Sequence, residues 1–520
     1  MTVQADQRPG AAARTARPVT LDLLGYLAPA GLMALALALK LALYGGASQD
    51  EAEWLLKSQS FQWGYDVENP PLVMWLGLAV RSLFGGGLAT LLTLKFALLA
   101  GFYALLYWAA RTATGQAAPA LAIATAPMAL YYVAWVPLNS YTHSVMLLAA
   151  MAGTAAAAVA LLRRPRPLVY LAFGVAAAAG LLAKYNFAPF LGGLLLALAV
   201  LPAGRTVLAS WWSLAALALT AALTAPHFLW LASHASDVAG ATAGNLQASG
   251  NAVLTALLAL PVLGQALLQF VLPLAVLLPL WFAKPLLREL PGAVTQSRLP
   301  AARLLGWQML FTLALFLAIA LLVGATHWRV HYLYPLALFG WPVIAAAWAR
   351  GADARRLLSF ALAGLVLQVA ALATLGGHAL TQGVDCSRCG EHIEYAAVAE
   401  ELRAAGYDGG GTIVSISTHK LYPGENLEPY FPQARTISTK WPMTRPPAPR
   451  NGGCLLVWPV RGYPDMPQRI TGSAVPPFDA PLPPPAASGR LPTPLRHAEG
   501  PGPGIGYALW PEPAAHCQRL

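Results

Sequence analysis

The sequence predicts a mainly α-helical bundle that crosses a membrane many times, followed by a small α/β domain. Three observations lead to this fold class. The 520 residues are 57% hydrophobic and only 11% charged, with a mean hydropathy of +0.55. Soluble domains carry about a quarter charged residues, so this chain has too little charge to be wholly soluble. Long apolar runs fill residues 19–377, whereas short β-rich runs occur after residue 377.

The apolar runs are long enough to cross a bilayer, which takes about 20 mainly apolar residues. Basic residues gather in alternate gaps between the runs, as in the cluster of Arg163, Arg164 and Arg166. This pattern predicts a cytoplasmic amino end and an outside carboxyl end. It explains the net charge of +11 by membrane orientation, without a nucleic-acid partner. The eleven predicted spans are 19–44, 88–110, 117–137, 141–161, 167–183, 186–202, 207–230, 253–282, 303–325, 332–349 and 357–377.

Composition divides the chain into four parts. Residues 1–18 form a basic cytoplasmic tail, and residues 19–377 form the membrane domain. Residues 45–87 are a long outside loop within that domain, and their apolar segment after Pro70-Pro71 predicts an interfacial helix. Residues 378–470 predict a small α/β domain, because a helical pattern precedes the runs GTIVSIS, ARTIST and CLLVWPV. Residues 471–520 are proline-rich and predict an extended or disordered tail.

All four cysteines lie in the predicted outside part. An even number of cysteines in an oxidising compartment predicts disulfides, and the sequence does not choose among the three possible pairings. Cys386-x-x-Cys389 with the nearby His392 keeps a zinc site open as the alternative. The remaining cysteines are Cys454 and Cys517.

Acidic residues open the outside loop. Ser48-x-x-Glu51 is a capping box, which predicts a helix start with Asp50 and Glu51 in the first turn. Acids at a helix start are favoured by the helix dipole, so a purely structural role is one interpretation. The other interpretation is catalytic: a carboxylate held at the membrane surface can take a proton from an acceptor hydroxyl.

Cations occur near the same predicted face of the membrane. Lys184 lies between two apolar runs, and Arg329 follows a span together with His331 and Tyr332. Such residues suit a phosphate ligand, although snorkelling and an interfacial aromatic belt explain them equally simply. Lys95 is a further cation in the second span. His143 lies in the turn PLNSYTH, and it could be either a ligand or an ordinary turn residue.

These residues resemble the hallmark motifs of the GT-C glycosyltransferases. The loop reads Asp50-Glu51-Ala52, then Trp54, then Gly64-Tyr65, then Asn69-Pro70-Pro71-Leu72. The segments GLLAKYN and HWRVHYLYPLALF are similar to later motifs of the bacterial branch near the protein O-mannosyltransferases and the lipid A aminoarabinose transferases. Where many relatives place a second acid after the third span, this chain has NSYTHS.

The resemblance implies a bacterial inner-membrane enzyme whose active site and C-terminal domain face the periplasm. Its donor would be a polyprenyl-phosphate sugar, and its acceptor a hydroxyl of an envelope glycolipid, glycan or protein. Asp50 would be the base, with Glu51 supporting it. Lys184, Arg329, Tyr332, Lys95 and His331 would bind the donor phosphate, while Tyr65, Asn69 and His143 would serve the acceptor or the loop. No cofactor is certain, and a divalent metal stays open. A transporter or flippase of a lipid-linked sugar is the alternative function.

Overall fold

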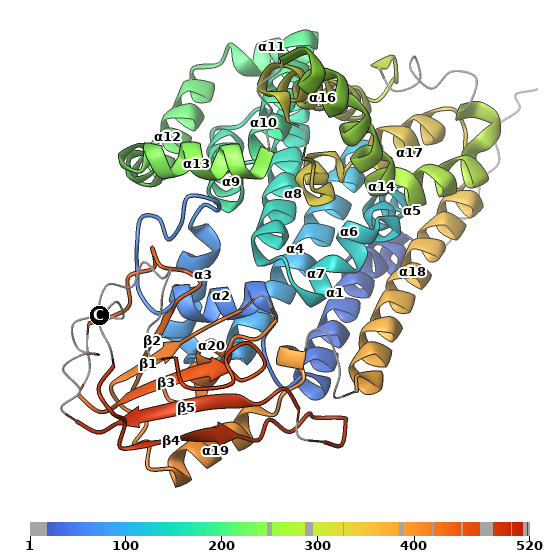
Figure 1. Ribbon diagram of the computed structural model, residues 1–520. Coiled ribbons are helices and arrows are strands. Elements are labelled where there is room, and N and C mark those ends of the chain that lie inside the picture. The colour runs from blue at the N-terminus through green and yellow to red at the C-terminus, as the bar shows by residue number, and fades with distance from the viewer. Residues whose placement is uncertain are drawn as a thin grey trace, which may run out of the picture.

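The computed structural model describes residues 18–246, 252–286, 295–325, 327–383, 389–418, 420–448, 451–467, 482–500, 502–512 and 517. A helical bundle occupies one end of the molecule and a five-stranded sheet the other, with two short helices between them (Figure 1). This is the predicted fold class. Residues 1–17, which hold most of the predicted basic tail, lie outside the described part.

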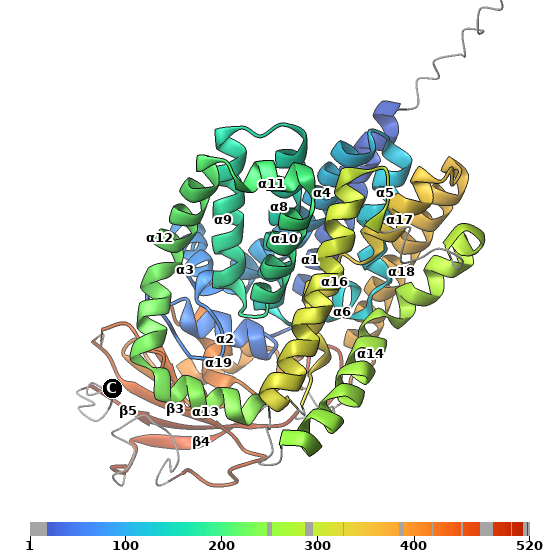
Figure 2. The ribbon, with the colours of Figure 1, turned by 90° about the horizontal axis from the view of Figure 1, so that it is seen from above.

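Eight helices of the described chain are long and apolar enough to cross a membrane. They run roughly side by side when the molecule is turned (Figure 2). One of these spans, Val330–Ala349, joins the 3-10 segment η3 (Val330–Leu336) to α17 (Gly340–Ala349). The other seven lie in α1 (Pro18–Leu43), α4 (Leu88–Thr114), α8 (Thr142–Arg163), α12 (Trp211–Ser233), α14 (Ala252–Leu286), α16 (Pro300–Ile319, continued by η2, Ala320–Gly324) and α18 (Ala354–Thr381).

Two of the eleven predicted spans are broken helices. The predicted span 117–137 consists of α5 (Ala117–Thr125), η1 (Ala126–Ala129), α6 (Tyr131–Ala134) and α7 (Val136–Asn139), and it bends by 91°. The predicted span 186–202 is α10 (Phe187–Val200), which turns by 111° into α11 (Pro202–Leu208). Prolines stand at the first turn of η1, α7 and α11, where their missing N–H and fixed φ favour a helix start. Hydropathy does not detect these breaks.

The helix α9 (Pro167–Ala183) is the remaining predicted span, and at 17 residues it is short for a crossing. The bundle is completed by α13 (Ala235–Leu246), which follows α12. The outside loop contains α2 (Gln49–Lys57) and α3 (Leu72–Phe84), which is the helix that the sequence predicts as interfacial. Ser48 and Glu51 form the predicted capping box, in which the Ser48 N–H donates to Glu51 Oε2 (2.9 Å). The sequence therefore determines correctly where α2 begins.

The C-terminal domain is a mixed sheet in the order β2-β1-β3-β5-β4. The three predicted strands are confirmed as β1 (Thr412–Ser415), β2 (Arg435–Ser438) and β3 (Cys454–Pro459), and they pair in parallel. The helices α19 (Tyr395–Ala404) and α20 (Pro423–Leu427) accompany them, with the 3-10 turns η4 (Cys389–Glu391) and η5 (Glu428–Tyr430). The predicted helix thus corresponds to α19.

The prediction that the proline-rich region is an extended or disordered tail is wrong for part of it. It contains β4 (Ala487–Leu491) and β5 (Ile505–Trp510), which add two antiparallel strands to the sheet, with β5 beside β3. The prolines of this region flank the strands and leave every ladder N–H in place. Cys454 on β3 is disulfide-bonded to Cys517, and Cys389 is disulfide-bonded as well. Disulfides were thus correctly predicted, and Cys389 is not a thiolate available to zinc. Cys386 lies outside the described residues.

The C-terminal domain is attached directly to the outside loop. Gly45 and Gly46, which follow α1, both donate their N–H groups to the carbonyl of Glu391 (3.1 Å). A Cβ on Gly45 would lie 2.2 Å from the carbonyl oxygen of Ile393, so only glycine permits this approach. Farther along, Gln59 exchanges two hydrogen bonds with the backbone of Thr436 on β2. These contacts fix the position of α2 relative to both domains.

Candidate active site

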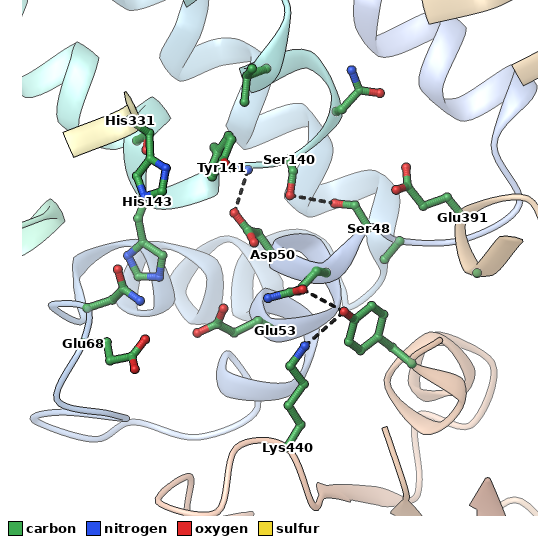
Figure 3. Close-up of a pocket in the computed structure, with 18 of the residues that line it drawn as sticks. Ser48, Asp50, Glu53, Glu68, Ser140, Tyr141, His143, His331, Glu391 and Lys440 are labelled. Carbon is green, nitrogen blue, oxygen red and sulfur yellow. Dashed lines mark hydrogen bonds between the residues drawn. The ribbon is translucent and has the colours of Figure 1, made fainter. Parts of the chain in front are cut away.

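A cavity of about 1240 Å³ opens between the bundle and the C-terminal domain. Its lining comes from segments far apart in the sequence: α2 and its following loop, the turn between α7 and α8, the α9–α10 turn, the segment 329–332 and two loops of the sheet. Figure 3 shows Asp50 near the middle of these groups. The charged side chains on the cavity wall are Asp50, Glu53, Asp66, Glu68, Lys184, Arg329, Glu391, Lys420 and Lys440.

Asp50 projects into this cavity from the first turn of α2. Its Oδ2 accepts a hydrogen bond from the backbone N–H of Tyr141 (2.7 Å), drawn in Figure 3. Tyr141 has φ 59° and ψ 49°, and it is the one non-glycine residue with positive φ in the described chain. Such a conformation costs of order 1–3 kcal/mol and is retained where surrounding structure imposes it. The turn before α8 thus aims a backbone N–H at Asp50.

The electrostatic surroundings of Asp50 suit a proton acceptor. Burial, with a further contribution from Glu53, raises the pKa of Asp50 to about 6. Lys184 and the Tyr141 N–H act in the opposite direction and favour the carboxylate. A carboxyl with this pKa is ionised at neutral pH and more basic than an ordinary aspartate, as a general base requires.

Glu51, the neighbouring acid, does not line the cavity. It is 1% exposed and lies between two buried lysines, with Lys95 Nζ at 2.8 Å from Oε1 and Lys40 Nζ at 3.4 Å from Oε2. These cations hold the pKa of Glu51 down to about 2 against the opposing effect of burial. Lys95 likewise points to Glu51 and not into the cavity. Glu51 and Lys95 therefore form a buried ion-pair group with Lys40 and do not face a substrate.

Two further carboxylates of the loop are paired through Lys57. This buried lysine bonds to Glu53 and to Asp66, and these charges raise its pKa. Asp66 Oδ1 also accepts from the N–H groups of Glu68 (2.8 Å) and Asn69 (2.7 Å). Asp66 thereby shapes the turn that precedes the proline pair. Asn69 lines the cavity beside it.

Lys184 and Arg329 are the cations that the membrane domain contributes to the cavity. Lys184 Nζ donates to Ser144 Oγ (3.1 Å) and lies 5.9 Å from the ring centroid of Tyr141. Burial lowers the pKa of Lys184 to about 8, Asp50 counteracts this effect, and Arg329 adds to it. Arg329 is exposed to the cavity at the start of η3. Lys184 and Arg329 thus interact electrostatically, and Lys184 also interacts with Asp50.

The other predicted site residues also line the cavity. The His331 ring lies against that of Tyr141 in a tilted arrangement with 5.2 Å between centroids, and Tyr332 contacts His331 edge to face. Tyr65 is buried, and its hydroxyl donates to the carbonyl of Ser60 (2.6 Å). His143 is 6% exposed, and neither ring nitrogen has a hydrogen-bond partner among the described residues.

Sequence reasoning missed the side chains that the C-terminal domain brings to the cavity. Tyr422 donates its hydroxyl to Gln49 Oε1 (2.9 Å), and Lys440 Nζ donates to the same tyrosine hydroxyl (3.1 Å), as Figure 3 shows. Gln49 directly precedes Asp50. A signal was available, since Lys420 and Lys440 are the two lysines of the chain after residue 378. Nothing in the sequence indicated that the backbone N–H of Tyr141 would donate to Asp50.

A divalent metal does not fit the donor set. Within the described ranges, no three His, Cys, Asp or Glu side chains are grouped so as to hold an ion. Asp66 and Glu53 are engaged by Lys57, and Asp50 by the Tyr141 N–H. No chemical step is therefore assigned to a metal.

The fold and this cavity define a class of protein. The structure is similar to that of ArnT from Cupriavidus metallidurans bound to undecaprenyl phosphate, with a TM-score of 0.53 and 14% identity, covering 85% of this chain and 94% of that one. The apo structure of the same protein matches equally, with 95% of that chain covered. This fold is the GT-C fold of membrane glycosyltransferases.

Sequence comparisons lead to the same class. The family profile of dolichyl-phosphate-mannose-protein mannosyltransferases matches residues 68–230. Two lipopolysaccharide core galacturonosyltransferases of Rhizobium johnstonii, RgtA and RgtB, are each 27% identical to the chain, over 439 and 441 residues. Both alignments cover 82% of this chain and 85% of the relative. The chain is a multi-span membrane glycosyltransferase of the GT-C type.

Proposed function

We propose that the protein transfers a sugar from a polyprenyl-phosphate donor to a hydroxyl of an envelope glycolipid, polysaccharide or protein. The reaction would take place on the periplasmic face of the bacterial inner membrane. The acceptor oxygen attacks C1 of the donor sugar, and its proton passes to Asp50. The bond from C1 to the phosphate oxygen breaks, and the lipid phosphate leaves with the electron pair. A direct displacement of this kind inverts the configuration at C1.

The observation that carries the proposal is the placement of Asp50. Its carboxylate lies in the shared cavity, oriented by the Tyr141 N–H, with a pKa raised to about 6. The adjacent acid, Glu51, forms ion pairs with Lys40 and Lys95 and does not line the cavity. Asp50 is therefore the carboxylate of the capping turn that is suited to remove a proton.

The cations of the same cavity suit the departing phosphate. Lys184 and Arg329 lie close enough to affect each other electrostatically, and both line the cavity. A leaving phosphate is stabilised when positive charge is already in place where negative charge develops. His331 and Tyr332 add polar side chains beside Arg329. The similar proteins include ArnT bound to undecaprenyl phosphate and a lipopolysaccharide core galacturonosyltransferase, which supports a lipid-linked donor and a glycolipid acceptor.

The test is a comparison of envelope glycans from a deletion strain carrying either the wild-type gene or Asp50→Asn. Mass spectrometry of glycolipids and glycoproteins should show one sugar mass that wild type restores and the variant does not. Purified wild-type protein in nanodiscs should transfer that sugar from its polyprenyl-phosphate form to lipid extracted from the deletion strain. Movement of the donor lipid across vesicles without any transfer would instead establish the flippase alternative.

A further inference from the structure

The cavity wall formed by α2 and the loop after it is acidic. Glu53, Asp66 and Glu68 all line the cavity, and Glu68 is the most exposed of the three. Lys57 forms ion pairs with Glu53 and Asp66. Three carboxylates against this one lysine leave the wall with net negative charge, and Asp50, on which Glu53 acts electrostatically, adds to it. A ligand on this wall would therefore meet hydrogen-bond acceptors and negative charge.

This acidic wall extends from the proposed base to a cation assigned to the lipid phosphate. Glu53 acts electrostatically on Asp50, and Arg329 acts on Glu68. Figure 3 shows Glu68 and His143 on the same side of Asp50. In the proposed reaction, C1 of the donor sugar lies between the acceptor oxygen at the base and the departing phosphate. The rest of the sugar ring would therefore lie along the acidic wall.

His143 adds an unpaired polar group to the same part of the cavity. It lies in the first turn of α8 and lines the cavity, although it is only 6% exposed. Glu53 and Asp66 act electrostatically on its ring, but neither ring nitrogen has a hydrogen-bond partner among the described residues. Leaving a buried polar group unpaired costs free energy, which a ligand hydroxyl would recover. Asn69 also lines the cavity and adds an amide that can donate and accept.

We propose that Glu53, Glu68, Asn69 and His143 bind the sugar that is transferred, and that this sugar bears hydroxyl or amino groups but no acidic group. The inference rests on the proposed sugar transfer, because it assigns the donor sugar of that reaction. Carboxylates accept hydrogen bonds from hydroxyl and amino groups, whereas the carboxylate of a uronic acid would meet like charge. Repulsion of this kind is a common source of specificity. The donor sugar would thus differ from that of the similar galacturonosyltransferases.

Donor binding tests the sugar class independently of catalysis. Native mass spectrometry of the full chain in nanodiscs would compare two matched pairs of undecaprenyl-phosphate sugars, galactose with galacturonic acid and glucose with glucuronic acid. Wild type should bind the neutral member of each pair roughly tenfold or more tightly than the uronic member. Glu68→Gln removes one negative charge, so it should lower this ratio roughly threefold or more by strengthening the binding of the uronic donor.

Controls separate the sugar from the phosphate and from folding. Affinities are expressed relative to plain undecaprenyl phosphate, so that any effect of Glu68 on the phosphate through Arg329 cancels. Glu68→Asp keeps the charge and should keep the preference for neutral donors. Glu400→Gln is the matched control, because Glu400 is an exposed glutamate of α19 that does not line the cavity. Equal or tighter binding of the uronic donors by wild type, or an unchanged ratio in Glu68→Gln, would overturn the proposal.

The same measurement keeps the sugar pocket and the proposed transfer apart. If wild type transfers no sugar yet prefers neutral donors in a way that depends on Glu68, the proposed function fails and the pocket stands. If wild type transfers a uronic acid at least as fast as the matching neutral sugar, the proposed function stands and the pocket is refuted.

Discussion

Asp50 and Glu51 are adjacent acids in the first turn of one helix, yet their surroundings are opposite. Asp50 faces the cavity and receives one backbone hydrogen bond, and its pKa is raised to about 6. Glu51 is buried between Lys40 and Lys95, and its pKa is lowered to about 2. Successive helical residues point about 100° apart, so one acid meets solvent and the other meets the bundle. The comparison teaches that position on the helix separates an acid that faces the cavity from one that is held in a buried ion-pair group.

The strongest test of this contrast is Asp50→Asn. Loss of a general base lowers the rate by about 10²–10⁴, so kcat should fall by that factor in a sugar-transfer assay. Folding should be unaffected or improved above pH 6, because the folded state raises this pKa and so disfavours the carboxylate. Thermal unfolding in detergent checks this second point. Transfer at the wild-type rate would contradict the assignment of the base.

Glu51→Gln should mainly lower the stability of the fold. Removing one partner of a buried ion pair costs about 3–5 kcal/mol, because Lys95 would lose its ion-pair partner Glu51 and Lys40 would keep only Glu391. The midpoint of thermal unfolding should drop sharply, and the double variant Glu51→Gln/Lys95→Met should recover part of it. A variant as stable as wild type but inactive would show that Glu51 takes part in the reaction.

The pH dependence sharpens the comparison. The proposed reaction requires ionised Asp50 and charged Lys184, so kcat/KM should rise with pH through about 6 and fall through about 8. Lys184→Arg should remove the alkaline fall, because arginine stays charged. The free energy of unfolding should depend on Glu51 in a different pH range. The pKa of Glu51 is lowered in the folded state, so the Glu51 carboxylate stabilises the fold fully above pH 4.5, the ordinary pKa, and this contribution is lost as the pH falls to about 2. A rate profile that is flat between pH 5 and 9 would count against both assignments.

The smallest expected effect is that of His143→Gln, on the Asp50 side of α2. The His143 imidazole is buried and has no hydrogen-bond partner among the described residues, so it is available to a substrate hydroxyl, and one neutral hydrogen bond contributes about 0.5–1.5 kcal/mol. The kcat/KM should therefore fall roughly three- to tenfold, with unchanged thermal unfolding. A large loss of stability with unchanged kinetics would give His143 a packing role instead.

Much of the architecture was predictable because it depends on local pattern. Apolar length located the helices of the bundle, and Ser48 with Glu51 located the start of α2. The strands β1, β2 and β3 followed from β-branched runs. The bends after η1 and α10, and the two strands in the proline-rich tail, were not predicted. Hydropathy and composition average over a window, whereas a helix break depends on single residues and a strand depends on its neighbours.

The sequence by itself determined that this is a membrane protein with acids and cations in a few short segments. Only the tertiary structure decided which of them meet. Asp50 receives its hydrogen bond from a residue 91 positions away, and Glu51 binds Lys95 across 44 positions. Tyr422 reaches Gln49 over 373 positions. Secondary structure depends on local sequence, but the surroundings that shift a pKa come from whatever the fold packs nearby, and that separates Asp50 from Glu51.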